Sequence, residues 1–208
     1  AKVYITSRSV QKLQSVCAEI GINTGHGFIL DFENAESVSS VVSEILSKEN
    51  RIDILINAAG VGIIKNFEQL TVEDMRKSIQ VNILGPFMVL QAVLPSMKEQ
   101  KKGLIINIPG VLGKTPMAGA AAYSASKYGL NGMMKSLREE LKRTEIRITQ
   151  MFLGGVDSPF WDTIDLRVQR EKMIVAEEAG KAIWFLCQQP ANAVVSEMVI
   201  QPFNHQAI

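Results

Sequence analysis

The sequence predicts a doubly wound α/β domain built on a parallel sheet. Strand-like runs alternate with helical patterns from one end of the chain to the other, as in sheets whose strands are joined by helices. The strand-like runs are continuously apolar rather than alternating, which is typical of strands covered on both faces. The chain has 208 residues, enough for a substantial core, and we expect residues 1–208 to form one domain.

The expected elements follow one another without a linker, an internal repeat or a low-complexity segment. Apolar runs predict strands at residues 3–6, 28–30, 52–56, 104–108, 146–152 and 194–200. Helical periodicity predicts helices at residues 10–20, 35–47, 72–79, 83–98, 122–142 and 177–186. In such a sheet, ligands bind where the carboxyl ends of the strands meet.

Composition and charge argue against several classes of function. Apolar residues make up 47% of the chain and charged residues 21%, which is ordinary for a soluble globular protein. A net charge of +1 gives no electrostatic argument for nucleic acid or an anionic membrane. Cys17 and Cys187 lack metal-site spacing, and no signal peptide or apolar run of about 18 residues is recognisable. We therefore expect a cytoplasmic protein with reduced thiols, and no metal, nucleic acid or membrane among its partners.

The most informative stretch contains Tyr123 and Lys127, four residues apart among small residues. Positions four apart lie on one face of a helix, so the Lys127 ammonium is expected near the Tyr123 phenol oxygen. A neighbouring positive charge favours phenolate and lowers a phenol pKa that is ordinarily about 10. Such a tyrosine is a usable general acid or base near neutral pH. The pair alone is a weak signal, because amphipathic helices contain it by chance.

Three further motifs accompany this pair. The segment 57–60 directly follows an apolar run, Asn82 lies within residues 81–87, and residues 153–159 close a further strand. In this order and spacing the set resembles the short-chain dehydrogenase/reductase family, whose Rossmann-type fold binds a nicotinamide cofactor. The resemblance covers essentially the whole chain and is specific, because four separate motifs agree.

By this resemblance, Tyr123 exchanges a proton with the substrate oxygen while hydride moves to or from the nicotinamide. Lys127 lowers the pKa of Tyr123 and binds the nicotinamide ribose, and Asn82 positions a water molecule behind the lysine. The alternative for Asn82 is a local hydrogen bond ahead of Gly85 and Pro86, which bend or start a helix. The alternative for the pair is a packed tyrosine with a solvated lysine.

The resemblance also implies a cofactor site at the carboxyl edge of the sheet. There the backbone of small residues approaches the cofactor ribose, at Asn57, Ala58, Ala59 and Gly60. Asn57 either contributes to that site or ties neighbouring strand ends together. Asp31 follows the run 28–30, and it either holds the adenine amino group or caps the following helix.

Ser7 and Arg8 stand at the end of the first strand-like run, where NAD-preferring relatives place an aspartate. Arg8 can form charge-assisted hydrogen bonds with a 2′-phosphate. We therefore expect NADP(H) as the cofactor rather than NAD(H). The alternative is a solvated arginine at the start of a helix.

Two positions depart from the family pattern. Gly110, preceded by Pro109, stands where relatives usually carry a serine that bonds the substrate oxygen, and neither side chain donates a hydrogen bond. Leu153 stands where the family's cofactor loop normally has proline, whereas Ser158 fits the residue that meets the nicotinamide carboxamide. Losing one oxyanion donor typically lowers turnover by about 10²–10³. We therefore expect impaired turnover with cofactor binding retained.

The chain begins at what resembles the second strand of this fold, and no segment matches the Gly-rich phosphate-binding turn. The first strand, its turn and the first helix, roughly 30 residues by ordinary element lengths, have no counterpart. That strand is central in a doubly wound sheet, so its two neighbours would be left unpaired. We therefore expect this sequence to be part of a longer chain.

Two functions follow from these observations. The first is an NADP-dependent oxidoreductase acting on a carbonyl or an alcohol, with Phe160 and Trp161 indicating an apolar substrate. The second is a catalytically silent relative that binds nucleotide or a partner protein, which Pro109 and Gly110 favour.

The helices at 83–98 and 122–142 carry more apolar residues than one side of a sheet needs. Examples are Leu84, Met88, Met133 and Leu137. An exposed apolar stripe favours self-association, and relatives commonly form dimers or tetramers through these helices. We expect a homodimer or a homotetramer.

Overall fold

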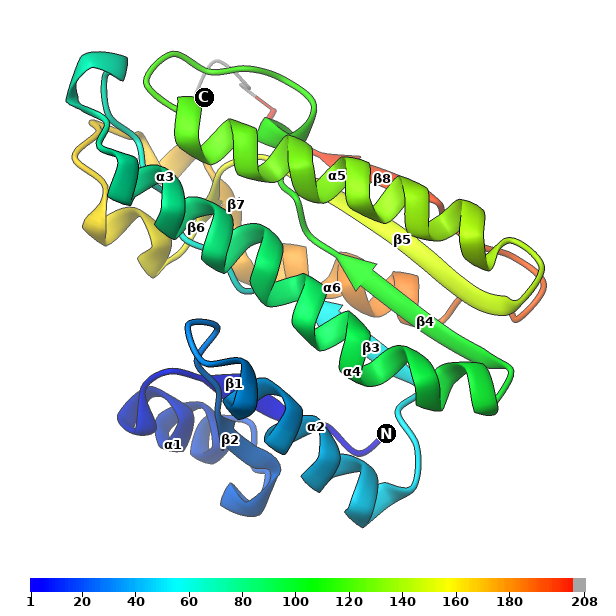
Figure 1. Ribbon diagram of the computed structural model, residues 1–208. Helices are drawn as coiled ribbons and strands as arrows, with labels where there is room; N and C mark the ends of the chain where they lie inside the picture. The colour runs from blue at the N-terminus through cyan, green and yellow to red at the C-terminus, as the bar shows by residue number, and fades with distance from the viewer. Residues whose placement is uncertain (204–208) are drawn as a thin grey trace.

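A parallel sheet forms the centre of the computed structural model, which describes residues 1–203 (Figure 1). Its four strands lie in the order β3-β4-β5-β8, and every neighbouring pair is parallel. Their bounds are β3 Ile54–Asn57, β4 Lys102–Asn107, β5 Glu145–Leu153 and β8 Glu197–Ile200. All four overlap apolar runs from which strands are predicted, and residues 204–208 of the predicted domain lie outside the described residues.

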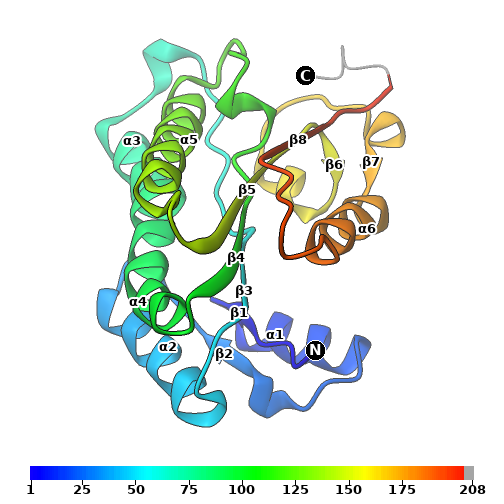
Figure 2. The same cartoon turned by 90° about the vertical axis from the view of Figure 1, so that its right-hand side faces the viewer.

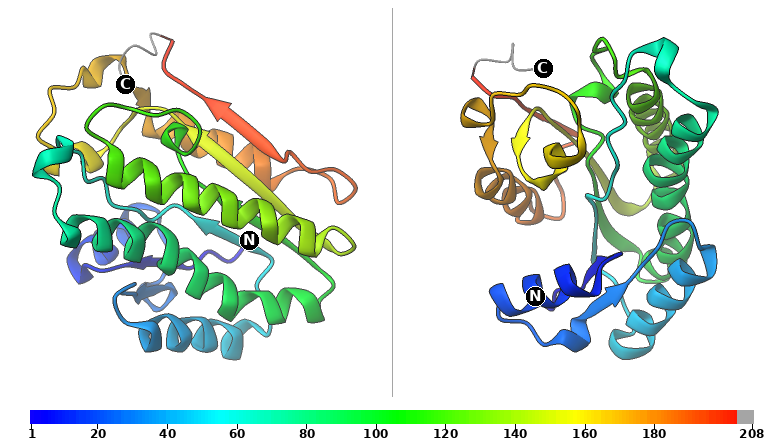
Figure 3. Two further views of the ribbon diagram at one scale, coloured as in Figure 1. Left: turned by 45° about the horizontal axis from the view of Figure 1, so that its top comes forward. Right: turned by 90° about the vertical axis from the view of Figure 1, so that its left-hand side faces the viewer.

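Two shorter parallel pairs accompany this sheet. The first joins β1 (Ile5–Ser7) to β2 (Gly27–Ile29), and it lies at the β3 side of the larger sheet, away from β8 (Figure 3). Within residues 1–203, β3 pairs only with β4, and its Ile54 is 40% exposed. The second pair, β6 (Val156–Asp157) with β7 (Ile174–Val175), is not predicted from the sequence because each strand has only two residues.

Helices cover both faces of the strands. Their bounds are α1 Val10–Glu19, α2 Ala35–Glu49, α3 Val72–Ile79, α4 Gly85–Glu99, α5 Ala121–Leu141 and α6 Ala176–Cys187. Figure 2 shows α2, α3, α4 and α5 on one side and α1 and α6 on the other. The predicted doubly wound α/β fold is therefore confirmed, and each predicted helix overlaps one of these six.

The continuous apolar character of β4 has a direct structural reason. Successive side chains of a strand point to opposite faces, so a strand covered on both sides needs apolar residues at every position. Ile105 packs in a core cluster with α4 and α5 residues such as Leu90 and Met134. Leu104 and Ile106 pack in a second cluster on the other face, with Leu186 of α6.

The predicted helices at 72–79 and 83–98 are joined into one continuous helix. Thr71 begins it with a capping box, and a π-helical turn, Gln80–Leu84, links α3 to α4. By length and composition alone, Val72–Glu99 is apolar enough to cross a membrane. Its apolar residues have a packing partner here, because the buried side of α4 faces the sheet and α2.

The expected apolar stripe on α4 and α5 is largely absent. Met88, Met133 and Leu137 are partly buried, because they pack against the core cluster between the helices and the sheet. Leu84 is 41% exposed, as expected. Other exposed apolar side chains on these helices include Phe87 and Tyr128.

Candidate active site

Tyr123 and Lys127 lie one turn apart near the start of α5, as their spacing predicts. The Lys127 side chain is buried, and its Nζ lies 5.6 Å from the centroid of the Tyr123 ring. Nζ donates a hydrogen bond to the backbone oxygen of Ile108, at 3.3 Å. Ile108 directly follows β4, so the carboxyl end of this strand fixes the lysine beside the tyrosine.

The pKa of Tyr123 departs from its expected direction. Burial raises the pKa of the Tyr123 phenol to about 12 and lowers the pKa of the Lys127 ammonium to about 8. Both shifts have the same cause, since loss of water disfavours phenolate and ammonium alike. The expected net lowering of the Tyr123 pKa is therefore not found, because burial dominates, while the opposing influence of the Lys127 charge stays a prediction. At neutral pH the phenol is protonated, which is the form that can donate a proton to a substrate oxygen.

Asn82 connects the helix to the loop that follows β3. The residue is fully buried in the π-helical turn; its Oδ1 accepts from the backbone nitrogen of Val61 at 2.9 Å. Its Nδ2 donates to the Val61 oxygen and to Ser126 Oγ, both at 2.9 Å. These partners are distant in sequence, so the local-bond alternative for Asn82 is wrong. Single π-turns are rare within α-helices and frequently lie at functional sites.

Gly60 is the point where Asn82 and Lys127 meet. A Cβ added at Gly60 would lie 3.1 Å from Asn82 Oδ1 and 3.2 Å from Lys127 Nζ. Both distances are tighter than ordinary Cβ contacts, so only glycine leaves the two polar groups undisturbed. The structure thus brings Tyr123, Lys127 and Asn82 into one site, while the water-positioning role of Asn82 stays a prediction.

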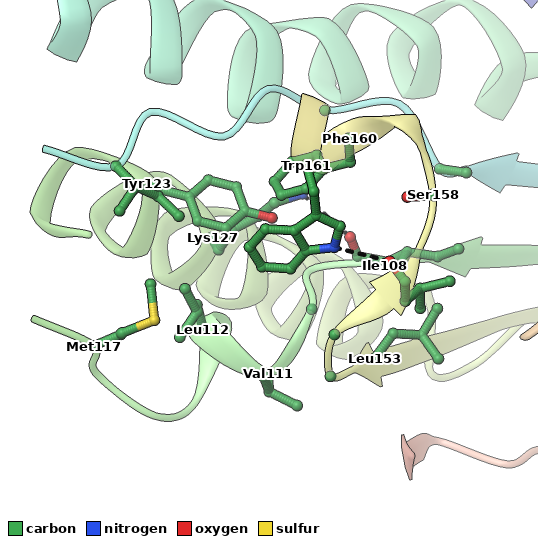
Figure 4. A pocket seen from close by; sticks show the side chains of 17 residues that line it. Ile108, Val111, Leu112, Met117, Tyr123, Lys127, Leu153, Ser158, Phe160 and Trp161 are labelled. Carbon is green, nitrogen blue, oxygen red and sulfur yellow. Dashed lines mark hydrogen bonds between the residues drawn. The ribbon is translucent and has the colours of Figure 1, made fainter. Parts of the chain in front are cut away.

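A cavity of about 220 Å³ lies beside Tyr123, where β3, β4 and β5 end (Figure 4). Ala58 lines it after β3, Gly110 after β4, and Gly154 after β5. Leu153, at the end of β5, and Ser158 also line it. Most of the lining is apolar.

Gly110 faces the proton-donating group but offers no side chain. An ideal Cβ on Gly110 would lie 4.0 Å from Tyr123 Oη and 3.5 Å from the Leu153 backbone oxygen. A serine hydroxyl at this position would therefore point into the space beside the phenol. The backbone of Gly110 has φ +71°, in the region where a Cβ is strained. Residue 110 thus lacks a side-chain hydrogen-bond donor and also has a backbone conformation that disfavours any residue with a side chain.

Phe160 and Trp161 enter the cavity from the short 3₁₀ helix Pro159–Thr163. The Phe160 ring lies 5.9 Å from the Tyr123 ring, centroid to centroid, and 5.2 Å from the Trp161 ring in an edge-on arrangement. Trp161 Nε1 donates to the Val156 oxygen at 2.9 Å. Figure 4 shows both aromatic rings beside Tyr123.

A second cavity of about 220 Å³ lies between the β1-β2 pair and the loop after β3. Its lining includes predicted cofactor residues from three segments of the chain: Ser7, Arg8, Asp31, Ala59 and Gly60. Gly60 lines both cavities, so the two adjoin at this residue. Together they offer an elongated site that runs from Arg8 to Tyr123.

The structure narrows the alternatives for Asp31 and Asn57. Asn34, not Asp31, caps α2, and its side chain accepts from the backbone nitrogens of Glu36 and Ser37. The helix-capping alternative for Asp31 is therefore wrong. Asn57 lies outside the linings of both cavities, and in the described chain its Nδ2 has no hydrogen-bond partner. Its backbone oxygen accepts from Ile108 at 3.1 Å, so the tie between strand ends is made by the main chain.

Comparison with known proteins identifies the family. The family model described as short chain dehydrogenase matches residues 1–168. The chain is 34% identical to an uncharacterized oxidoreductase of Staphylococcus saprophyticus, over 97% of this chain and 86% of that protein. The chain belongs to the short-chain dehydrogenase/reductase family.

Solved structures of the short-chain dehydrogenase/reductase family agree with this assignment. A metagenomic short-chain oxidoreductase in complex with NADP superposes with a TM-score of 0.80 at 29% identity, covering 97% of this chain and 86% of that one. Serine dehydrogenase from Escherichia coli superposes with a TM-score of 0.82 at 27% identity, covering 97% and 87%. The recognised motifs and the fold thus lead to the same family.

Three residues of this short-chain dehydrogenase/reductase site are not found by sequence reasoning. Val61 and Ser126 bind Asn82, and Gly62 contacts Phe160. Gly62 carries a usable signal, because an isolated glycine in a loop often marks a close approach. The partners of Asn82 carry none, since their contacts depend on the tertiary arrangement of α5 and the loop after β3.

Proposed function

We propose that this protein is an NADP-dependent oxidoreductase that transfers hydride between NADP(H) and a carbonyl or alcohol substrate. The observation that carries the proposal is the elongated site, with a protonated phenol at one end and Arg8 at the other. The chain belongs to an oxidoreductase family, and relatives with NADP bound have the same fold. These findings support a nicotinamide cofactor.

The residues present fit such a cofactor. Gly60 lacks room for a side chain, so its backbone can lie against a bound ribose. Arg8 lines the second cavity, and none of the carboxylates in residues 1–203 forms a salt bridge with it. A guanidinium left without an ion-pair partner suits a 2′-phosphate.

When bound, the reduced nicotinamide supplies a hydride to the carbonyl carbon. Tyr123 donates its phenol proton to the substrate oxygen, for which a pKa of about 12 keeps that proton available. Lys127 holds a positive charge beside the phenol and stabilises the phenolate left by that transfer. Asn82 fixes the loop after β3 through its bonds to Val61, and the missing side chain of Gly60 leaves room for Lys127 Nζ beside this loop.

Because glycine stands at position 110, we expect this enzyme to have a low turnover. The same residue favours the second candidate function, a catalytically silent relative that binds a nucleotide or a partner protein. No side chain at residue 110 orients the substrate oxygen, although the position faces Tyr123 Oη. The decisive experiment mixes the protein with NADPH, follows cofactor fluorescence, and then measures NADPH consumption with a panel of ketones, quinones and oxoacyl thioesters. Consumption that Tyr123→Phe abolishes supports the enzyme, whereas binding without consumption supports the silent relative.

Replacing Arg8 with alanine should weaken NADPH binding by roughly ten- to hundredfold and leave NADH binding nearly unchanged. A charge-assisted hydrogen bond contributes about 1.5–3 kcal/mol, and NADH lacks the phosphate that would receive it. Fluorescence titration with both cofactors measures the difference. Lys12→Ala is the matched control, because Lys12 is an exposed cation on α1 outside the cavity lining. Equal weakening of both cofactors would remove the argument for Arg8, and an intrinsic preference for NADH would remove the NADP assignment.

We also propose a cytoplasmic location and a homo-oligomeric state. The free thiols Cys17 and Cys187 support a reducing compartment. The exposed apolar side chains of Leu84, Phe87 and Tyr128 support self-association through α4 and α5. Size-exclusion chromatography with light scattering tests the second statement.

A further inference from the structure

We infer that Phe160 sets the size of the substrate that reaches Tyr123, and that the cavity takes small, uncharged, apolar carbonyl compounds. This inference rests on the proposed function, because it names the substrate class of the same site. Four observations carry it: the contact of Phe160 with Gly62, its contact with Tyr123, the bonds that hold its loop, and the chemistry of the lining.

Phe160 packs directly against the loop that follows β3. A Cβ added at Gly62 would lie 2.3 Å from Phe160 Cζ, 2.9 Å from Phe160 Cε2 and 3.0 Å from Ile164 Cδ1. No residue with a side chain fits there while the ring keeps this position. The phenylalanine ring and the glycine backbone therefore form a closed contact at one wall of the cavity.

The same ring also contacts the proton-donating residue. The Phe160 and Tyr123 ring centroids are 5.9 Å apart with the planes tilted by 42°, a favourable aromatic arrangement. Phe160 thus spans the space between the loop after β3 and α5, beside the phenol (Figure 4). A substrate ring next to Tyr123 must fit within the space that Phe160 leaves.

Arg170 and Trp161 hold the segment that carries Phe160. Arg170 donates from Nε to Asp157 at 2.6 Å, from Nη1 to Asp162 at 2.7 Å, and from Nη2 to the Ser158 oxygen at 3.0 Å. A single exposed ion pair contributes little, but three bonds from one guanidinium join the residues before the 3₁₀ helix to a residue within it. Trp161 Nε1 adds its bond to Val156 at 2.9 Å. These hydrogen bonds therefore fix the position of the segment that carries Phe160.

The lining argues against ionised substrates. Among residues 1–203, Tyr123 and Lys127 are the only ionisable side chains that line this cavity, and Lys127 Nζ lies toward Gly60 and donates to the Ile108 oxygen. A carboxylate or phosphate beside Phe160 would lose its hydration here with no cation other than Lys127 to replace it. Apolar side chains such as Ile64, Leu112 and Met117 form the rest of the wall. An apolar cavity of about 150 Å³ holds one benzene ring, so 220 Å³ shared with a nicotinamide leaves room for a small substrate.

The test compares Phe160→Ala with the unmodified protein in the presence of NADPH. Binding of benzyl alcohol and of 2-naphthalenemethanol is measured by quenching of Trp161 fluorescence, in a Trp184→Phe background that removes the other tryptophan. We expect Phe160→Ala to improve binding of the naphthyl alcohol relative to the benzyl alcohol by roughly 10–100-fold. 4-Carboxybenzyl alcohol should bind at least about tenfold more weakly than benzyl alcohol to both proteins. NADPH affinity should stay within about twofold.

Two further variants complete the design. Gly62→Ala should weaken binding of both alcohols, because the new Cβ displaces the Phe160 ring into the cavity. Phe67→Ala should change nothing, since Phe67 begins the 3₁₀ helix Phe67–Gln69 after this loop, is 73% exposed and lies outside the lining.

An equal change for both alcohols in Phe160→Ala would overturn the size-setting role. An increase of tenfold or more in NADPH affinity would overturn it as well, because the ring would then occupy cofactor space. Tight binding of the carboxylated alcohol would overturn the charge assignment. Failure of the proposed function looks different, since NADPH consumption would then be absent with every compound of the carbonyl panel, while the alcohol-binding comparison still decides the role of Phe160.

Discussion

Replacing Gly110 with serine should raise turnover by about 10–10³-fold, the reverse of losing one oxyanion donor. The new Cβ would lie 4.0 Å from Tyr123 Oη, so its hydroxyl can reach a substrate oxygen that also contacts the phenol. NADPH consumption with a carbonyl substrate under saturating cofactor measures the effect. The gain should appear in kcat more than in KM, because the added bond strengthens as charge develops on the oxygen.

The backbone at residue 110 opposes part of this gain. With φ +71° and ψ 168°, it lies in a region that is essentially restricted to glycine, and a residue with a Cβ is strained there by roughly 1–3 kcal/mol. Gly110→Ala is the matched control, since it introduces the same strain without a hydroxyl. Combining Gly110→Ser with Pro109→Ser relaxes the preceding residue, and the pair is the fairer test if the single variant unfolds. Tyr123→Phe in the serine background should erase the gain, because the proton donor is gone.

If Gly110→Ser and the paired variant both bind NADPH yet consume none, the silent-relative function replaces the enzyme. If Gly110→Ala raises turnover as much as Gly110→Ser, the effect comes from the backbone rather than from the hydroxyl. Each result assigns a different role to this position.

The fold could be predicted from the sequence where a local pattern carries the information. The continuous apolar run that contains Leu104, Ile105 and Ile106 predicts a strand that is packed on both faces. In the structure its residues belong to two core clusters, one on each face of the sheet. The π-helical turn at Gln80–Leu84 could not be predicted, because nothing local distinguishes it from a break between two helices. Asn82 within this turn bonds to Val61, which is 21 residues away in the chain, so the accompanying contact is not visible in the local sequence either.

In the candidate site, too, some features could be predicted from the local sequence and others could not. The spacing of Tyr123 and Lys127 predicts their proximity, because a helix turn brings them together. The direction of the Tyr123 pKa shift depends on how deeply the phenol is enclosed, and spacing contains no such information. Gly110 is conspicuous as a departure from a motif, whereas its positive φ and its approach to Tyr123 Oη require the three-dimensional structure.

Replacing Lys127 with methionine should stabilise the protein and abolish most of its turnover. The buried ammonium has a pKa of about 8, against 10.5 for an unperturbed lysine, so the folded state disfavours its charge. A shift of this size corresponds to about 3 kcal/mol at neutral pH. Methionine has a similar length, fills the same space, and needs no hydration. Urea unfolding of the cofactor-free proteins at pH 7 measures the gain, and loss of the charge beside Tyr123 should lower turnover by about 10²–10⁴.

The pH dependence of this gain has a defined sign. Between pH 8 and pH 10.5 the unfolded chain holds the Lys127 proton that the folded chain has released, so the unmodified protein becomes more stable as pH rises. The advantage of Lys127→Met is therefore full below pH 8 and declines toward pH 10.5. Tyr123 is present in both proteins, so its own titration cancels in the difference. Lys12→Met, at an exposed position on α1, should show no such gain at any pH.

A Lys127→Met variant that is less stable than the unmodified protein at pH 7 would mean that the bond from Nζ to Ile108 outweighs the burial of the charge. A stable but inactive variant would instead show that this lysine is retained for catalysis at the expense of stability.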